Sequence, residues 1–368
     1  MKKYLRKLHL WLSIPVGVIV FIVCITGAML VFQDEILQWA NPSHYYVSEV
    51  KDTPMPLDEL IPLVNAQLNE NSVATVQIFS DPQRTYAMGL KEGFRVSAFV
   101  NPYTAEVTGY YYFQESPFFV IMRLHRWLMD GTRTWGKYAV GISTLVFIII
   151  LLTGLFIQPS KFFRKNTFVI SRGKGKARLL YDLHNVLGVY ACILLLVGAL
   201  TGLMWSFTWY RNGVFKLFGA EVTQTQGHGG GAVRGNKGRG DETEKEKRLN
   251  VTHWQTVYNQ LQKQNPDMEY MRIQDHKASV HLSTFVTSRA MDVYNFDARS
   301  GEIKGVEYYK DSAKSSQVWG WVYSLHVGNF WGIWSKILVF IAALIGASLP
   351  VTGYWMYFKK LRRKQKKA

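Results

Sequence analysis

Cysteine is scarce in this chain of 368 residues, which contains only Cys24 and Cys192. Both lie inside apolar stretches, so the sequence predicts no disulfide in the segments between those stretches. The sequence also lacks a P-loop, a G-x-G-x-x-G motif after a strand, a G-x-S-x-G motif and an H-E-x-x-H motif. These absences argue against nucleotide binding, serine-hydrolase chemistry and zinc-protease chemistry.

Long apolar runs are abundant. Four stretches of about 20 residues contain almost no charge, and they cover residues 10–33, 138–157, 185–207 and 337–357. At about 1.5 Å per residue, each is long enough to cross a hydrocarbon core of about 30 Å. The first run is too long for the apolar region of a signal peptide and no small-x-small site follows it, so we expect an uncleaved helix. The sequence therefore predicts a membrane α-helical fold with a four-helix transmembrane bundle.

Excess positive charge is confined to three short segments. Residues 1–7, 158–183 and 358–368 contain 18 Lys and Arg against one acidic residue, Asp182, so they account for the whole net charge of +17. The positive-inside rule places these segments, and with them both termini, in the cytoplasm. We expect no nucleic-acid partner, because the basic residues do not cluster on a folded part outside the membrane.

Two long connecting segments, 34–124 and 208–325, end in related sequences. VNPYTAEVTGYYYF (100–113) and FDARSGEIKGVEYY (296–309) align at a constant offset of 196 residues. Each reads as a strand, a tight turn and a second strand, and each follows a stretch with helical periodicity. The sequence thus predicts an internally duplicated chain with two α+β modules outside the membrane.

The expected organisation has eight parts in chain order. They are a first span (1–33), a first outer module (34–124), a histidine-bearing segment with the second span (125–157), a basic cytoplasmic loop (158–183), a third span (184–207), a second outer module (208–325), a histidine-bearing segment with the fourth span (326–357) and a basic tail (358–368). The second module contains an insert, 223–248, rich in Gly and charge, which we expect to be disordered.

Four histidines flank the apolar runs and precede Thr-Gly pairs. His9, His125, His184 and His326 precede Thr26-Gly27, Thr153-Gly154, Thr201-Gly202 and Thr352-Gly353 by 17, 28, 17 and 26 residues. The predicted topology puts His9 and His184 at the cytoplasmic face and the other two at the outer face. A single such histidine is usually an interfacial anchor, but a set of four beside spans indicates function. Two imidazoles at each face fit two bis-histidine hemes, and without a C-x-x-C-H motif these would be noncovalent b-type hemes.

Short segments surround these histidines: LHLWLSIPVG, RLHRWL, DLHNVLGVY and SLHVGNFWG. With the twice-repeated order of span, helix-plus-hairpin module and span, they make the chain resemble the PepSY-associated transmembrane family. The resemblance covers the chain apart from the insert. It implies a multi-pass protein of the bacterial inner membrane with periplasmic PepSY-like modules. Some members are ferric-siderophore reductases with two b-type hemes, which implies axial ligation by His9, His184, His125 and His326 and electrons from a separate cytoplasmic or quinol donor.

Basic and aromatic residues near the histidines indicate further contacts. Heme propionates need cationic or hydrogen-bonding partners, for which we expect Arg123 and Arg126 at the outer pair and Arg178 at the cytoplasmic pair. Aromatic residues crowd the outer pair in sequence, and those expected to dock an acceptor are Tyr111, Trp319, Trp321 and Trp331. The alternative for these is an interfacial aromatic belt. No acidic cluster suits bare iron, so the expected acceptor is a ferric siderophore or other iron chelate of little charge.

Two other functions remain open. The first is a non-catalytic PepSY membrane protein that binds a peptide or regulates a protease, which leaves the fourfold histidine pattern unexplained. The second is a quinol-linked di-heme cytochrome with a different acceptor. The remaining histidines show no zinc-site spacing, so we expect structural roles for them: His44, His228, His253, His276 and His281.

Overall fold

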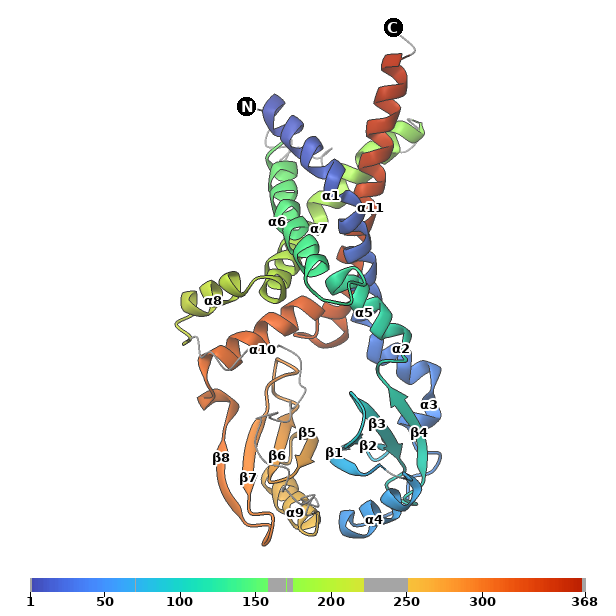
Figure 1. The fold of residues 1–368 in the computed structure, drawn as a ribbon, viewed down its shortest axis with the longest axis vertical. Helices are drawn as coiled ribbons and strands as arrows, with labels where there is room; N and C mark the ends of the chain where they lie inside the picture. The colour runs from blue at the N-terminus through green and yellow to red at the C-terminus, as the bar shows by residue number, and fades with distance from the viewer. Residues whose placement is uncertain (1, 70, 158–169, 171–174, 222–250, 366–368) are drawn as a thin grey trace. The chain divides into compact units, whose positions relative to one another are not determined.

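The computed structural model describes residues 2–69, 71–157, 170, 175–221 and 251–365 (Figure 1). The insert 223–248 and most of the basic loop 158–183 lie outside the described residues. The chain forms two compact units. The membrane unit contains Met1–Gln33, Pro117–Val222 and Trp321–Ala368, and the sheet unit contains Asp34–Ser116 and Thr223–Gly320.

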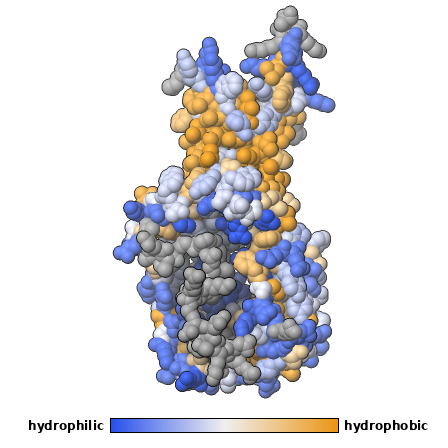
Figure 2. All heavy atoms as spheres, viewed as in Figure 1, coloured by the Kyte–Doolittle hydropathy of each residue, from blue (hydrophilic) through white to orange (hydrophobic). Residues whose placement is uncertain are grey.

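The four predicted spans correspond to four long helices of the membrane unit. These are α1 (Lys2–Val31), α6 (Trp135–Phe156), α7 (Lys176–Ser206) and α11 (Gly332–Gln365). Among the described residues, these four helices are long and apolar enough to cross a membrane. Figure 2 shows apolar side chains around them and hydrophilic residues at their ends. The chain is therefore a multi-pass membrane protein.

The spans pack in a ring around an apolar centre. α1 and α7 each pack against both α6 and α11, so α1 and α7 lie diagonally opposite in the bundle. Val20, Phe147, Leu195 and Ala342 belong to the cluster that fills the centre, one from each of the four helices. Small residues such as Ala342 allow the close helix approach that is typical of membrane bundles.

Short helices connect the spans of the membrane unit. α5 (Pro117–Trp127) precedes α6 and packs against α1 and α6, while α8 (Thr208–Leu217) follows α7. α10 (Lys314–Val327) starts in the sheet unit and precedes α11. The C-terminal ends of α5 and α10 carry His125 and His326.

The sheet unit is built around one antiparallel sheet. Its strands are β1 (Val73–Phe79), β2 (Tyr86–Leu90), β3 (Val96–Val100), β4 (Val107–Tyr112), β5 (Met268–Gln274), β6 (Lys277–Leu282), β7 (Asp292–Phe296) and β8 (Ile303–Glu307). Their spatial order is β4-β3-β2-β1-β5-β6-β7-β8. The helices of this unit are α2 (Gln33–Ala40), α3 (Pro42–Tyr45), α4 (Leu57–Gln67), α9 (Trp254–Gln264) and the short η2 (Tyr309–Asp311).

The two predicted outer modules share this sheet and do not fold as separate bodies. β1 of the first segment pairs with β5 of the second, with Gln77 opposite Arg272. One hydrophobic core draws on both segments and includes Leu60 of α4, Trp254 of α9 and Met271 of β5, all fully buried. Separate modules would each expose an edge strand at β1 or β5, and the pairing removes both edges.

The two predicted hairpins form and contain the same turn. The Ala105 N–H donates to the Asn101 carbonyl at 3.0 Å, and the Gly301 N–H donates to the Asp297 carbonyl at 2.8 Å. Ala105 and Gly301 have φ of 59° and 72°, a left-handed conformation that glycine adopts without strain. The constant sequence offset between the hairpins thus corresponds to equal backbone geometry.

Candidate functional site

The membrane unit brings the four predicted histidines together in two pairs. His9 of α1 faces His184 of α7, with ring centroids 6.4 Å apart and an interplanar angle of 85°. His125 of α5 faces His326 of α10, with centroids 6.2 Å apart and an angle of 57°. Because α1 and α7 are diagonally opposite, the first pair meets across the bundle.

Each ring is held through its Nδ1 atom by a threonine of a Thr-Gly pair. The Nδ1 to Oγ1 distances are 3.2 Å for His9 with Thr153, 3.2 Å for His125 with Thr26, 2.8 Å for His184 with Thr352 and 3.0 Å for His326 with Thr201. In every case the threonine lies on a span of the same half of the chain, on a different helix from the histidine. The two spans of each half therefore position the two histidines of that half.

The hydrogen bonds assign the protonation of the rings. The Nδ1 atoms of His9, His125 and His326 also lie 3.1, 2.9 and 3.1 Å from backbone carbonyl oxygens three residues before the threonine. A carbonyl oxygen only accepts, so Nδ1 carries the hydrogen and the lone pair of the neutral ring is on Nε2.

His184 follows the same rule, since its ring bonds the backbone of Leu349, three residues before Thr352, as well as the threonine itself. The Thr352 hydroxyl donates to the Ser348 carbonyl at 3.0 Å, so its oxygen is left to accept from the His184 Nδ1–H. Metal-binding histidines commonly donate their second ring N–H to a carbonyl or another acceptor, which fixes the tautomer and the ring orientation. All four rings are thus prepared to ligate through Nε2.

The glycine of each Thr-Gly pair gives its imidazole room. A Cβ atom at Gly27 would lie 3.1 Å from His125 Cε1, and one at Gly154 would lie 3.2 Å from His9 Cε1. The corresponding distances are 3.2 Å at Gly202 and 3.6 Å at Gly353, toward His326 and His184. The Thr-Gly pair therefore works as a unit in which threonine binds the ring and glycine leaves space for it.

The second pair is held in the neutral form. Burial lowers the pKa of His125 and of His326 to about 4, and the charge of Arg126 contributes in the same direction to both. The Arg126 guanidinium therefore lies near both rings. A histidine must be neutral to ligate a metal ion, and these two are neutral at physiological pH.

The other two predicted propionate partners differ in whether an acidic residue offsets their charge. The Arg123 guanidinium donates to the Met129 carbonyl at 3.2 Å, close to the end of α5. The Arg178 guanidinium forms an ion pair with Asp182 at 3.0 Å, one helical turn further along α7. Of the three predicted cations, Arg126 is thus the one whose charge acts on both His125 and His326.

The four predicted docking residues are divided between the two units. Trp321 and Trp331 belong to the membrane unit and are 44% and 67% exposed. Trp319 and Tyr111 belong to the sheet unit, where the Tyr111 ring packs against Phe113 with centroids 6.4 Å apart. No single site within one unit contains all four.

Sequence reasoning missed Trp205. Its ring centroid lies 5.1 Å from that of His326, one helical turn beyond Thr201, which bonds the same imidazole. The four-residue spacing from the threonine was a signal that could have identified it. At the equivalent position after Thr26 the chain has Leu30, so the aromatic contact is specific to one histidine.

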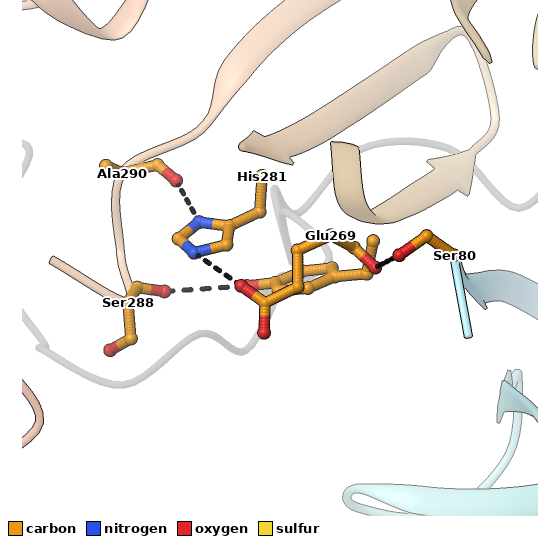
Figure 3. A network of polar contacts seen from close by, with 6 residues as sticks. Ser80, Glu269, His281, Ser288 and Ala290 are labelled. Carbon is orange, nitrogen blue, oxygen red and sulfur yellow. Dashed lines mark hydrogen bonds and ion pairs between the residues drawn. The ribbon is translucent and has the colours of Figure 1, made fainter. Parts of the chain in front are cut away.

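Of the other histidines, His281 has the most extensive contacts. Figure 3 shows its Nδ1 directed at the Ala290 carbonyl, 2.6 Å away, and its Nε2 at the Glu269 carboxylate, 3.4 Å away. The ring also stacks on Tyr270, with centroids 4.9 Å apart. These bonds join β6 to β5 and to the loop before β7, which is a structural role. His228 lies outside the described residues.

A histidine pair alone is an incomplete ligand set for a bare metal ion. Among the residues that the structure describes, no group of three or more His, Cys, Asp or Glu side chains could hold a metal ion. The pairs instead suit a cofactor that brings most of its metal ligands with it, as a heme does.

The spans and the histidine pairs define an α-helical membrane protein that presents two facing imidazoles at each end of a four-helix bundle. Residues 6–360 match the family described as PepSY-associated TM region, and the chain belongs to this family. The resemblance seen in the sequence is thereby confirmed. No curated protein matches the chain.

Proposed function

We propose that the chain binds two b-type hemes and transfers electrons across the bacterial inner membrane to a ferric siderophore or another ferric chelate. The observation that carries the proposal is the set of four Nε2 lone pairs, two at each end of the bundle, fixed by the same Thr-Gly contacts. Ligation of a metal ion by paired histidines needs this arrangement. An interfacial anchor requires neither a partner histidine nor a fixed tautomer.

The distance within each pair supports one iron between two imidazoles. Two rings that bind one metal ion through bonds of about 2 Å have centroids about 6 Å apart, and the pairs lie at 6.4 and 6.2 Å. Bound heme would supply one-electron oxidation and reduction in an apolar environment. Arg126, near both His125 and His326, would offer its charge to a propionate there.

The spacing of the pairs along α1 supports a path across the membrane. His9 belongs to one pair and Thr26 holds a ring of the other, and they are 17 residues apart, or about 25 Å of helix. The positive-inside rule assigns the His9–His184 end and both termini to the cytoplasm. The sheet unit would then be periplasmic, and the donor would be a separate quinol or cytoplasmic reductant.

The contact pattern also supports internal duplication. Each half of the chain pairs its own histidines with its own threonines, and each facing pair takes one histidine from each half. In this arrangement each heme would lie between the two halves.

A reduced-minus-oxidised visible spectrum of the purified protein tests the cofactor. We expect a low-spin b-type spectrum that ferric siderophore reoxidises under anaerobic conditions, with ferrous iron trapped by a colorimetric chelator. A protein without a Soret band after expression with ample heme would refute the proposal. Hemes that a quinone or a periplasmic protein reoxidises, but no ferric chelate does, would favour the quinol-linked cytochrome.

A further inference from the structure

The His125–His326 end of the membrane unit carries an excess of positive charge. The segments that flank it, residues 117–137, 207–221 and 321–336, contain seven Lys and Arg and two acidic residues. One of these acids, Asp130, is buried and accepts hydrogen bonds from the Thr134 and Gly136 N–H groups at 2.8 and 3.1 Å. The positive-inside rule predicts few basic residues on an outer face, so membrane anchoring does not explain this excess.

Two of the cations share one aromatic ring. The guanidinium carbons of Arg126 and Arg133 each lie 4.7 Å from the ring centroid of the buried Trp127. The two charges are therefore no further apart than the sum of these distances, and they repel each other. An anion beside the exposed Arg133 would be attracted by both charges, and guanidinium groups bind carboxylates and similar oxyanions in a bidentate manner.

A strained turn fixes this arrangement. Leu128, Met129 and Arg133 have φ of 50°, 65° and 57°, although none is a glycine. Asp130 ties the turn to the start of α6 through its backbone hydrogen bonds, and a Cβ atom at Gly136 would meet the Trp127 carbonyl oxygen at 1.8 Å. Backbone strain of this kind persists only where surrounding contacts impose it, and it clusters at ligand-binding sites.

We propose that this end of the bundle binds an anionic ferric chelate, with Arg133 on Trp127 as its anchor. The proposal rests on the proposed function and assigns the acceptor a negative charge, where the sequence suggested little charge. The two propionates of one heme would occupy two cations, expected to be Arg123 and Arg126. Arg133 has no carboxylate partner among the described residues and is left for the chelate.

The reaction is a single electron transfer. The Fe(III) of the chelate would take up one electron from a reduced heme and become Fe(II), with no bond formed to the protein. Hard oxygen ligands hold Fe(II) less tightly than Fe(III), so the metal is released more readily after reduction. The role of Arg133 is to raise the local concentration of the anion before this transfer.

Stopped-flow reoxidation of the dithionite-reduced full chain tests the proposal. The probes are Fe(III)–EDTA, an anion, and a ferric trihydroxamate with a free ammonium group, a cation. We expect the rate with the anion to fall as ionic strength rises and the rate with the cation to increase or stay constant. Arg133→Gln should lower the reoxidation rate with the anion by about threefold to tenfold at low salt. It should also weaken the salt dependence of that rate, while heme content and absorption spectrum stay unchanged.

Arg211→Gln is the matched control, because Arg211 lies on α8 at the same end and has no contact with Trp127 among those that the structure describes. If the reoxidation rate with the anion falls equally in the two variants, the effect is a general electrostatic attraction, and the proposed site at Arg133 is wrong. A rate with the anion that is independent of salt and of Arg133 would overturn the proposal while leaving the reductase function intact. Absence of heme, or failure of every chelate to reoxidise it, would overturn both.

Discussion

The His9–His184 end and the His125–His326 end of the bundle hold their imidazole rings with the same contacts. At both ends a threonine oxygen accepts from Nδ1, and a glycine follows that threonine. The surroundings differ. Arg178 at the first end is neutralised by Asp182, whereas Arg126 and Arg133 at the second end stack on one tryptophan.

The ring geometry differs as well. The interplanar angle is 85° at the first end and 57° at the second, where Trp205 packs against His326. Under the proposed function, the contacts common to both ends would hold a common cofactor. The residues that differ between the ends would then adapt each end to its own electron donor or acceptor.

Removal of one histidine should have the largest effect and should distinguish the two ends of the bundle. In His125→Ala we expect one of two hemes to be lost and reoxidation by ferric chelate to fall by at least about 100-fold, because the acceptor end loses an axial ligand. In His9→Ala one heme should also be lost, from the other end. Heme per chain and chelate-driven reoxidation are the measurements. His276→Ala, at an exposed histidine of the sheet unit, should change neither.

Loss of the threonine acceptor should have the next largest effect. Thr201→Val keeps the shape of the side chain but removes one of the two oxygen atoms that bond His326 Nδ1, the Gly198 carbonyl oxygen being the other. Heme at that end should therefore be bound about 10- to 100-fold more weakly. Transfer of heme to apomyoglobin measures the change. Thr144→Val is the matched control, since among the described residues the Thr144 hydroxyl bonds only the Val140 carbonyl of its own helix. Equal heme loss in both variants would contradict the assigned role.

Replacement of Trp205 should alter one heme without releasing it. Trp205→Leu, which copies Leu30 of the first half, frees the His326 ring to turn. We expect a shift on the order of 30 mV in one midpoint potential and a changed EPR signal for that heme, with the second signal unaffected. The exposed Trp209 on α8 is the control position. An identical shift in both hemes would show a general effect on the bundle.

A methyl group beside the ring should have the smallest effect. Gly202→Ala would place Cβ 3.2 Å from His326 Cε1, and we expect heme affinity to fall by about fivefold, equivalent to about 1 kcal/mol of overpacking. Gly198→Ala on the same helix adds a methyl group that meets nothing within 4 Å and should raise helix stability slightly. Heme retention after repeated chromatography compares the two variants. Greater heme loss in Gly198→Ala than in Gly202→Ala would contradict the role of Gly202 in leaving room for the His326 ring.

The sequence predicts those features that depend on local pattern. Apolar runs gave the four spans, and the spacing of His9 and His184 from their Thr-Gly pairs, with the topology, indicated which histidines share a membrane face. The two hairpins were also predictable, because turn residues and strand patterns are local. Each of these inferences needs only a window of neighbouring residues.

Features that depend on long-range packing were not predictable. That Thr153 would bond His9 depends on how α6 packs against α1, which no spacing within one helix encodes. The merged sheet depends on β1 pairing with β5 across about 190 residues, and strand patterns alone do not choose a partner. The turn at Asp130 uses left-handed residues that are not glycine, so it carries no common sequence signal.

Heme content per chain tests most directly whether each histidine pair binds one heme. The pyridine hemochrome assay on pure, heme-replete protein, with protein measured independently, should give two b-type hemes per chain. It should give one in His125→Ala and one in His9→Ala, and the double variant should contain none. Two hemes in either single variant, or none in the unaltered protein, would contradict the account.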